Sequence, residues 1–115
     1  MDIKVYGIPN CGSVKKAKDW LSQHEIKFTF HDYKKTLIDK ESLKRWCKEF
    51  GWEKLVNKKG LTWKALPDEV KLKITNDETA IDLMLANNSI IKRPVIESSK
   101  INLVGFDEKE YKQLL

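Results

Sequence analysis

The sequence predicts an α/β fold in which a four-stranded mixed sheet is interrupted by an all-helical insertion. Residues 2–6 and 26–31 alternate apolar with polar side chains and flank a helical pattern, which predicts a parallel strand–helix–strand unit. Residues 94–97 and 101–104 predict an antiparallel hairpin, and a closing helix follows it. Between these two groups the chain shows helical patterns and no convincing strand.

The first strand contains the β-branched Ile3 and Val5 and leads into a loop rich in turn residues, from Gly7 to Gly12. A helix is expected from about Ser13 to Gln23, because apolar residues recur on one face while charged residues occupy the other. Its apolar face consists of Val14, Ala17 and Leu21. One face of the second strand consists of Ile26, Phe28 and Phe30.

The middle of the chain, about residues 38–87, is predicted to be the helical insertion. Asp39 is suited to cap a helix over residues 40–50, and Gly51 ends that helix. Pro67 opens a short helix through Ile74, and Asn76 or Asp77 caps a third. The apolar faces of the first and third helices consist of Leu43, Trp46, Cys47 and Phe50, and of Ala80, Ile81, Met84 and Leu85.

The last part of the chain returns to strands. Pro94 is expected at a strand start, because proline cannot donate a hydrogen bond to a neighbouring strand. Ser98 to Lys100 form the hairpin turn, and Asp107 caps a helix from Glu108 to Leu115. Without the insertion the order is βαβ followed by ββα, which is the order of the thioredoxin-like fold. We therefore expect one domain over residues 1–115.

The core of that domain comprises about residues 1–37 and 88–115. The chain has 115 residues, of which 41% are hydrophobic, and no apolar run approaches the roughly 20 residues that span a membrane. The N-terminus lacks a basic segment followed by an apolar one, so no secretory signal is expected. Two cysteines are too few for a disulfide framework. These features favour a cytoplasmic, monomeric protein that does not contact a membrane.

The net charge of +5 suggests nucleic-acid binding at first sight. Only Arg45 and Arg93 among the 22 basic residues are arginine, and the lysines are spread along the chain between acidic residues. Proteins that read bases or hold phosphates favour arginine for its bidentate fork. We therefore interpret the charge as a solvated surface and expect no direct contact with nucleic acid.

Cys11 is the candidate catalytic residue, because it lies between the end of a strand and the start of a helix. A thiolate there meets unpaired backbone N–H groups and the positive end of the helix dipole, and Lys15 and Lys16 add positive charge. Gly12 leaves the sulfur open to a reactant. The alternative is an inert cysteine packed beneath the first strand.

The residue three positions after Cys11 is Val14, so the C-x-x-C dithiol of thioredoxins is absent. A mixed disulfide on Cys11 must then be resolved by an external thiol such as glutathione. Cys47 lies on an apolar helix face and is expected to fill the core, although a disulfide between the two cysteines stays open. Neither His24 nor His31 has metal-ligand spacing relative to a cysteine, so no metal is expected.

Arg93 and Pro94 form the second informative pair. In the thioredoxin-like order, a proline at the start of the third strand is commonly cis and brings the preceding backbone beside the cysteine. Arg93 would then point at the same pocket, where it could stabilise the thiolate or hold a carboxylate, a phosphate or another oxyanion. The alternative is a surface arginine that precedes a strand.

Four segments of the chain resemble the bacterial ArsC/Spx/YffB family, in the same order and over the whole chain. The segments are Tyr6 to Ala17, Asn57 to Trp63, Ile91 to Ile96 and Val104 to Glu108. The sequence is most similar to the YffB-like branch. The resemblance implies a thioredoxin-like fold with an all-helical insert, which agrees with the order of elements above.

The YffB-like branch implies a glutathione-dependent thiol-disulfide reductase that uses a single nucleophilic cysteine, with glutathione as co-substrate and no bound cofactor. The substrate site would consist of Cys11, Asn10, Gly12, Ser13, Val14, Arg93 and Pro94, with Lys15 and Arg93 stabilising the thiolate. The Spx branch implies the alternative, a transcriptional regulator that binds the RNA polymerase α C-terminal domain. Arsenate reductases of the family use three arginines, and this chain has Asn57 to Lys59 and Phe106 where two of them would fall.

Overall fold

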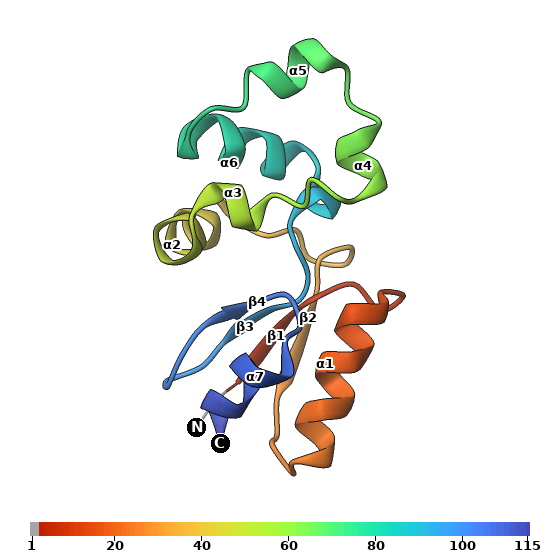
Figure 1. Cartoon of the computed structure of the whole chain (residues 1–115), viewed down its shortest axis with the longest axis vertical. Coiled ribbons are helices and arrows are strands. Elements are labelled where there is room, and N and C mark those ends of the chain that lie inside the picture. The colour runs from red at the N-terminus through yellow and green to blue at the C-terminus, as the bar shows by residue number, and fades with distance from the viewer. Residues whose placement is uncertain (1–2) are drawn as a thin grey trace. The chain divides into compact units, whose positions relative to one another are not determined.

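A computed structural model describes residues 3–115 of the chain. The contacts divide the chain into two compact units, which we call the sheet unit (residues 1–36 and 93–115) and the helical unit (residues 37–92) (Figure 1). No helix within the described residues is long and apolar enough to cross a membrane.

The sheet unit contains a four-stranded sheet in the order β2-β1-β3-β4. Strand β1 (Lys4–Gly7) runs parallel to β2 (Thr29–Asp32) and antiparallel to β3 (Val95–Glu97), which pairs antiparallel with β4 (Leu103–Val104). This mixed four-stranded sheet, with its elements in the predicted order along the chain, confirms the thioredoxin-like α/β fold.

Helices α1 (Gly12–Gln23) and α7 (Glu108–Tyr111) pack on the sheet, and a short 3-10 helix, Lys112–Leu114, follows α7 (Figure 1). The edge of the Trp20 ring contacts the Tyr111 ring, with 5.5 Å between the ring centres. The buried core of this unit consists of Ile3, Val5, Ala17, Trp20, Leu21, Ile96, Leu103, Tyr111 and Leu114. The apolar face predicted for the first helix therefore lies against the sheet.

Strand β2 begins at Thr29, three residues later than the sequence predicts. The backbone N–H groups of Glu25 and Ile26 donate to carbonyls of α1, Ser22 O and Leu21 O, and Glu25 has a positive φ of 57°. These residues therefore close the helix and cannot pair with β1. Ile26 and Phe28 still pack against the core, so the predicted apolar face is right although the strand boundary is wrong.

The helical unit contains α2 (Lys40–Phe50), α3 (Trp52–Leu55), α4 (Leu61–Lys64), α5 (Asp68–Leu72), α6 (Asp77–Ala86) and a 3-10 helix, Asn88–Ile90. Asp39 caps α2 by accepting from the backbone N–H of Ser42, and Gly51 follows that helix with a φ of +85°. Asn76 caps α6 through a reciprocal pair with Thr79. The predicted caps are thus observed, whereas the single turn of α4 was not predicted.

The packing of α6 differs from the predicted face at one position. Leu83 is buried and Leu85 is only half-buried, although the periodicity places Leu85 in the core. Asn88, which directly follows this region, is also buried; its amide accepts from Ile38 N (2.7 Å) and donates to Met84 O (2.7 Å). These two hydrogen bonds link Ile38, near the start of the helical unit, through Asn88, near its end, to Met84 of α6.

Candidate active site

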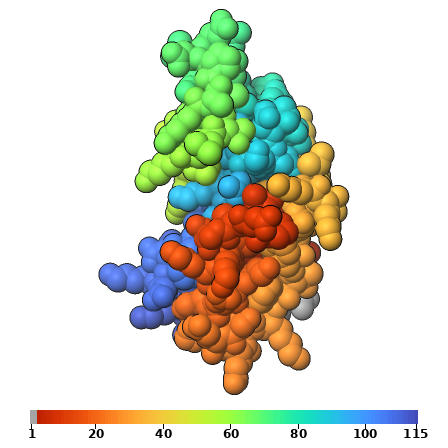
Figure 2. All heavy atoms as spheres, turned by 90° about the vertical axis from the view of Figure 1, so that its right-hand side faces the viewer, coloured from red at the N-terminus to blue at the C-terminus, as the bar shows by residue number. Residues whose placement is uncertain are grey.

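Cys11 is the N-cap of α1, where its backbone is extended and its carbonyl accepts the first helical hydrogen bond, from Lys15 N (3.0 Å). The side chain is half-buried, and the thiol is free. Figure 2 shows the segment before α1 and α1 itself at the surface of the sheet unit. A reactant can therefore reach the sulfur, and the prediction that Cys11 stands at a helix start is observed.

Gly7 allows the first turn of α1 to pack closely on the end of β1. A Cβ atom at Gly7 would lie 2.6 Å from Val14 Cγ2, which is closer than real side chains approach. Val14 itself is fully buried. The lack of a side chain at Gly7 therefore helps to fix the loop that carries Cys11.

Arg93 and Pro94 are joined by a cis peptide bond, as expected for a proline at this position of the fold. Pro94 directly precedes β3, and its carbonyl accepts from Gly105 N (2.8 Å). The side chain of Arg93 forms a hydrogen bond with the Cys11 sulfur. The structure therefore brings together the two residues that the sequence analysis singled out.

The pKa of the Cys11 thiol lies below its ordinary value. Partial burial acts to raise this pKa, but the backbone N–H group of Val14, the Arg93 side chain and the backbone N–H group of Ser13 lower it, and the Arg93 charge adds to their effect. The balance favours the thiolate, which is the nucleophilic form of cysteine.

Lys15 was expected to stabilise the thiolate as well. In the structure its ammonium lies 3.0 Å from the Asp19 carboxylate on the exposed side of α1. Asn10 and Gly12 are exposed beside Cys11, and a Cβ atom at Gly12 would meet no atom within 4 Å. Neither of these exposed neighbours is among the groups that lower the Cys11 pKa, which are Val14, Arg93 and Ser13.

Tyr33 is a residue of this site that the sequence analysis missed. Its ring is buried, and the charges of Arg93, Tyr6 and Cys11 act on its hydroxyl group. Within the described residues this hydroxyl has no hydrogen-bond partner. The sequence signal for a role of Tyr33 was its aromatic side chain, which comes just after the strand predicted to end at residue 31.

Cys47 is buried in the helical unit, as predicted. Burial, together with the charge of Asp77, raises the pKa of its thiol to about 11. It is therefore protonated and unreactive at neutral pH, and it is a free thiol like Cys11. Among residues 3–115, no group of three or more histidine, cysteine or acidic side chains is placed to hold a metal ion.

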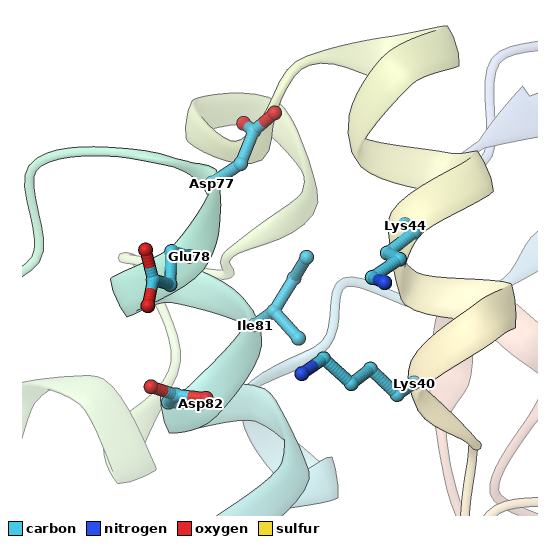
Figure 3. A pocket seen from close by; sticks show the side chains of 6 residues that line it. All are labelled: Lys40, Lys44, Asp77, Glu78, Ile81 and Asp82. Atoms are coloured by element: carbon cyan, nitrogen blue, oxygen red, sulfur yellow. The ribbon is translucent and has the colours of Figure 1, made fainter.

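Each of the two units carries a groove among its described residues. The first, of about 400 Å³, lies between α2 and α6 in the helical unit, where Lys40 and Lys44 reach toward Ile81 and face a row of acidic residues (Figure 3). Its lining residues include no cysteine, serine or threonine. The second, of about 420 Å³, lies in the sheet unit beside the loop that precedes Cys11. Its lining residues are Pro9, Lys18, Phe30, His31, Asp32, Lys35 and Thr36.

The two positions where arsenate reductases would carry further arginines have other roles here. The Lys58 ammonium lies over the rings of Trp52 and Trp63, 5.2 and 5.6 Å from their centres. Phe106 packs edge-on against Tyr111, with 4.9 Å between the ring centres. Phe106 thus adds apolar contact to the core of the sheet unit and brings no charge.

Comparison with known proteins places the chain in a family. The ArsC family model matches residues 6–114. An uncharacterized protein of Haemophilus influenzae is 43% identical over 109 residues, which cover 95% of each chain. The global transcriptional regulator Spx of Streptococcus agalactiae is 30% identical over 115 residues, which cover 98% of this chain and 82% of the regulator. The solved structure of a YffB protein is 44% identical, covers 96% of each chain and superposes with a TM-score of 0.90. The chain belongs to the ArsC family.

Proposed function

We propose that the protein is a monothiol, glutathione-dependent thiol-disulfide reductase. The observation that carries the proposal is the Cys11 thiol at the N-terminus of α1, whose pKa is lowered by the backbone N–H groups of Val14 and Ser13 and by the Arg93 side chain. These groups favour the ionised, nucleophilic form of the thiol, and the Cys11 residue is only half-buried.

The reaction has two exchanges. The Cys11 thiolate attacks the glutathione sulfur of a mixed disulfide R–S–S–G; the new bond is Cys11–S–S–G, and R–S⁻ leaves and takes a proton from water. A glutathione thiolate then attacks the glutathione sulfur bound to Cys11, which releases oxidised glutathione and restores the Cys11 thiolate. In sum, R–S–S–G and one glutathione thiolate give R–S⁻ and oxidised glutathione: the R sulfur is reduced from the disulfide to the thiol level, and the sulfur of the incoming glutathione is oxidised from the thiol to the disulfide level.

An external thiol is required because the chain offers no resolving cysteine in this site. Val14 occupies the position of the second cysteine of a C-x-x-C motif, and Cys47 is buried with a pKa raised to about 11. The groove beside Pro9 carries Lys18 and Lys35, which suits the carboxylates of glutathione. A reducing cytoplasm would supply this thiol, and the proposal needs no bound metal or cofactor.

The test is to expose the protein to oxidised glutathione and to map the adduct by mass spectrometry. We expect one glutathione on Cys11, none after Cys11→Ser, and an unchanged adduct after Cys47→Ser. Addition of reduced glutathione should then release the adduct and regenerate the thiol. An adduct on Cys47 alone, or no adduct on the native protein, would contradict the proposal.

A second candidate function is a transcriptional regulator that binds the RNA polymerase α C-terminal domain. The observation that favours it is the 30% identity to Spx over 98% of this chain. A pull-down with the isolated α domain separates the two candidates, with the Cys11→Ser variant as control. Binding by both forms, together with an unreactive Cys11, favours the regulator; a reactive Cys11 without binding favours the reductase. We expect no arsenate turnover, since Asn57 to Lys59 and Phe106 supply no arginine.

A further inference from the structure

The groove of the sheet unit offers charges of both signs to a ligand. Its volume of about 420 Å³ falls in the range of about 300–1,000 Å³ that is usual for small-molecule sites. Its lining residues come from the loop before Cys11, from α1, from the end of β2 and from the turn that follows β2. Because β2 runs parallel to β1, the groove lies at the carboxyl end of a parallel strand, where α/β sheets bind their ligands.

Lys18 places a positive charge at a defined point of this groove. The residue is half-buried, and its ammonium lies over the Phe30 ring, 4.3 Å from the ring centre. On the same helix, Lys15 pairs with the Asp19 carboxylate at 3.0 Å, whereas no acidic side chain among residues 3–115 pairs with Lys18. A positioned cation without a counter-charge suits an anionic group of a ligand.

The turn after β2 is held by hydrogen bonds and brings a second cation to the groove. The Nε2 atom of the His31 ring donates to Thr36 O (2.8 Å). The backbone N–H groups of Lys35 and Thr36 donate to Asp32 O at 3.2 and 3.0 Å. These bonds fix the backbone from which the Lys35 side chain reaches the groove.

Asp32 is the acidic residue of this lining and has room for a further donor. Its side chain accepts from Lys34 N through Oδ1 (2.8 Å), and the residue is half-buried. Among the described residues no ion pair joins its carboxylate to Lys18 or Lys35. Since a carboxylate accepts several hydrogen bonds on its two oxygens, Asp32 can hold the turn and accept from an ammonium group at the same time.

The groove is within reach of the candidate nucleophile. Pro9 lines the groove and stands two residues before Cys11, so the Cα atoms of the two are at most about 7 Å apart. An extended tripeptide spans about 10 Å. A tripeptide thiol with one end in the groove therefore has the length to present its sulfur to Cys11.

We propose that this groove binds the α-amino-acid end of glutathione, with the α-carboxylate held by Lys18 and Lys35 and the α-ammonium held by Asp32. The inference rests on the proposed function, and it adds which end of the co-substrate is recognised and by which residues. The two charged groups share one carbon atom, so a groove with two cations and one anion matches both at once. The favoured substrates are then disulfides that carry a free amino-acid end.

The first test measures binding without thiol chemistry. S-methylglutathione carries both charged groups and no free thiol, and its N-acetyl derivative lacks only the ammonium. Titration of the native protein, followed by NMR, gives the Kd of each probe and shows which backbone amides shift. We expect S-methylglutathione to shift amides of residues 30–36, and the acetylated probe to bind about fivefold more weakly, as for loss of one partly exposed ion pair.

Three variants assign the contacts. Lys18→Gln should weaken both probes about fivefold, since both carry the α-carboxylate. Asp32→Asn keeps an acceptor for Lys34 N but loses the charge, so it should weaken S-methylglutathione and leave the acetylated probe unchanged. Lys34→Gln is the matched control and should change neither Kd, because Lys34 is exposed and does not line the groove.

Three results would overturn the assignment. One is an equal Kd for the two probes on the native protein, which needs no variant and so does not depend on the folding of one. Another is a set of amide shifts that leaves out residues 30–36. The third is a loss of binding in Lys34→Gln as large as that in Lys18→Gln, because any surface lysine would then serve.

The second test separates this inference from the proposed function. Oxidised glutathione carries the amino-acid ends, and bis(2-hydroxyethyl) disulfide is uncharged. We expect Lys18→Gln to slow adduct formation on Cys11 about fivefold with the first and not with the second. If native Cys11 reacts with neither disulfide, the proposed function fails, while the NMR titration still decides what the groove binds. If native Cys11 reacts with both and Lys18→Gln is equally fast, or is slowed equally with both, the groove assignment alone fails.

Discussion

The Arg93 side chain lies beside the Cys11 thiol and lowers its pKa, although the two residues belong to the two separate chain segments of the sheet unit. Cys11 stands where β1 leads into α1, and Arg93 precedes the cis proline at the start of β3. Because β1 and β3 are neighbours in the sheet, the ends of these two loops meet. This contact is the basis of the first prediction.

Arg93→Gln should raise the pKa of Cys11, because it removes both a hydrogen bond to the thiolate and a positive charge near it. The fraction of Cys11 present as thiolate at neutral pH then falls. At a pH well above the Cys11 pKa of both the native protein and the variant, the alkylation rate of Cys11 should be the same in the two. Thiolate absorbance measured against pH gives the pKa directly. Lys15→Gln is the matched control: it also removes one positive charge, but that charge pairs with Asp19 at an exposed position, so we expect a smaller rise. Equal rises in the two variants would contradict the role of Arg93.

Gly7→Ala should destabilise the protein by about 1–3 kcal/mol, as for overpacking of a buried site, because the new methyl group would lie 2.6 Å from Val14 Cγ2. Gly12→Ala should change the free energy of unfolding by less than about 0.5 kcal/mol, since its Cβ atom would stand in open space. Urea unfolding followed by tryptophan fluorescence measures both. Similar losses for the two variants would show that Gly7 has no special packing role.

Asn88→Ala should destabilise the helical unit by about 1–3 kcal/mol, because the backbone N–H of Ile38 loses its acceptor in a buried place. The carbonyl of Met84 loses its donor in the same variant. Asn102→Ala is a matched control that removes one hydrogen bond from a half-exposed turn, and its cost should stay below about 1 kcal/mol. Comparable costs in chemical denaturation would contradict the bridging role of Asn88.

Tyr111→Phe should cost about 1 kcal/mol of stability, because it removes the hydrogen bond to Gly105 O. Tyr33→Phe should leave the free energy of unfolding unchanged or raise it, since the Tyr33 hydroxyl has no hydrogen-bond partner among residues 3–115. Thermal unfolding of the two variants under identical conditions compares them. A loss of stability in Tyr33→Phe as large as that in Tyr111→Phe would mean that the Tyr33 hydroxyl already has a partner.

The sequence predicted the fold well where local signals were strong. Three features with short-range physical causes were predicted and are present in the structure. They are the apolar alternation near residues 3–5, the helix caps Asp39 and Asn76, and the turn glycine Gly51. The start of β2 was wrong because Glu25 and Ile26 close helix α1 by hydrogen bonds that periodicity does not reveal. Leu85 was misplaced because three-dimensional packing buries Leu83 in its stead.

The candidate site was predicted in part. Cys11 and Arg93 carry visible chemistry and lie at element boundaries, so a sequence argument could pair them. The sequence signal for Tyr33 was weak, an aromatic residue just after a strand, because its burial and its unsatisfied hydroxyl arise only from the tertiary fold. Lys15 is adjacent to the cysteine in sequence, but its side chain turns outward to Asp19.

The central claim is that Cys11 is an activated thiolate, and its alkylation rate as a function of pH tests this most directly. The Cys47→Ser variant isolates the Cys11 signal, and iodoacetamide serves as an uncharged probe. We expect a rate profile with a pKa below the free-thiol value of about 8.5. A pKa at or above that value would contradict the claim, since the backbone N–H groups of Val14 and Ser13 and the Arg93 side chain would then fail to outweigh burial.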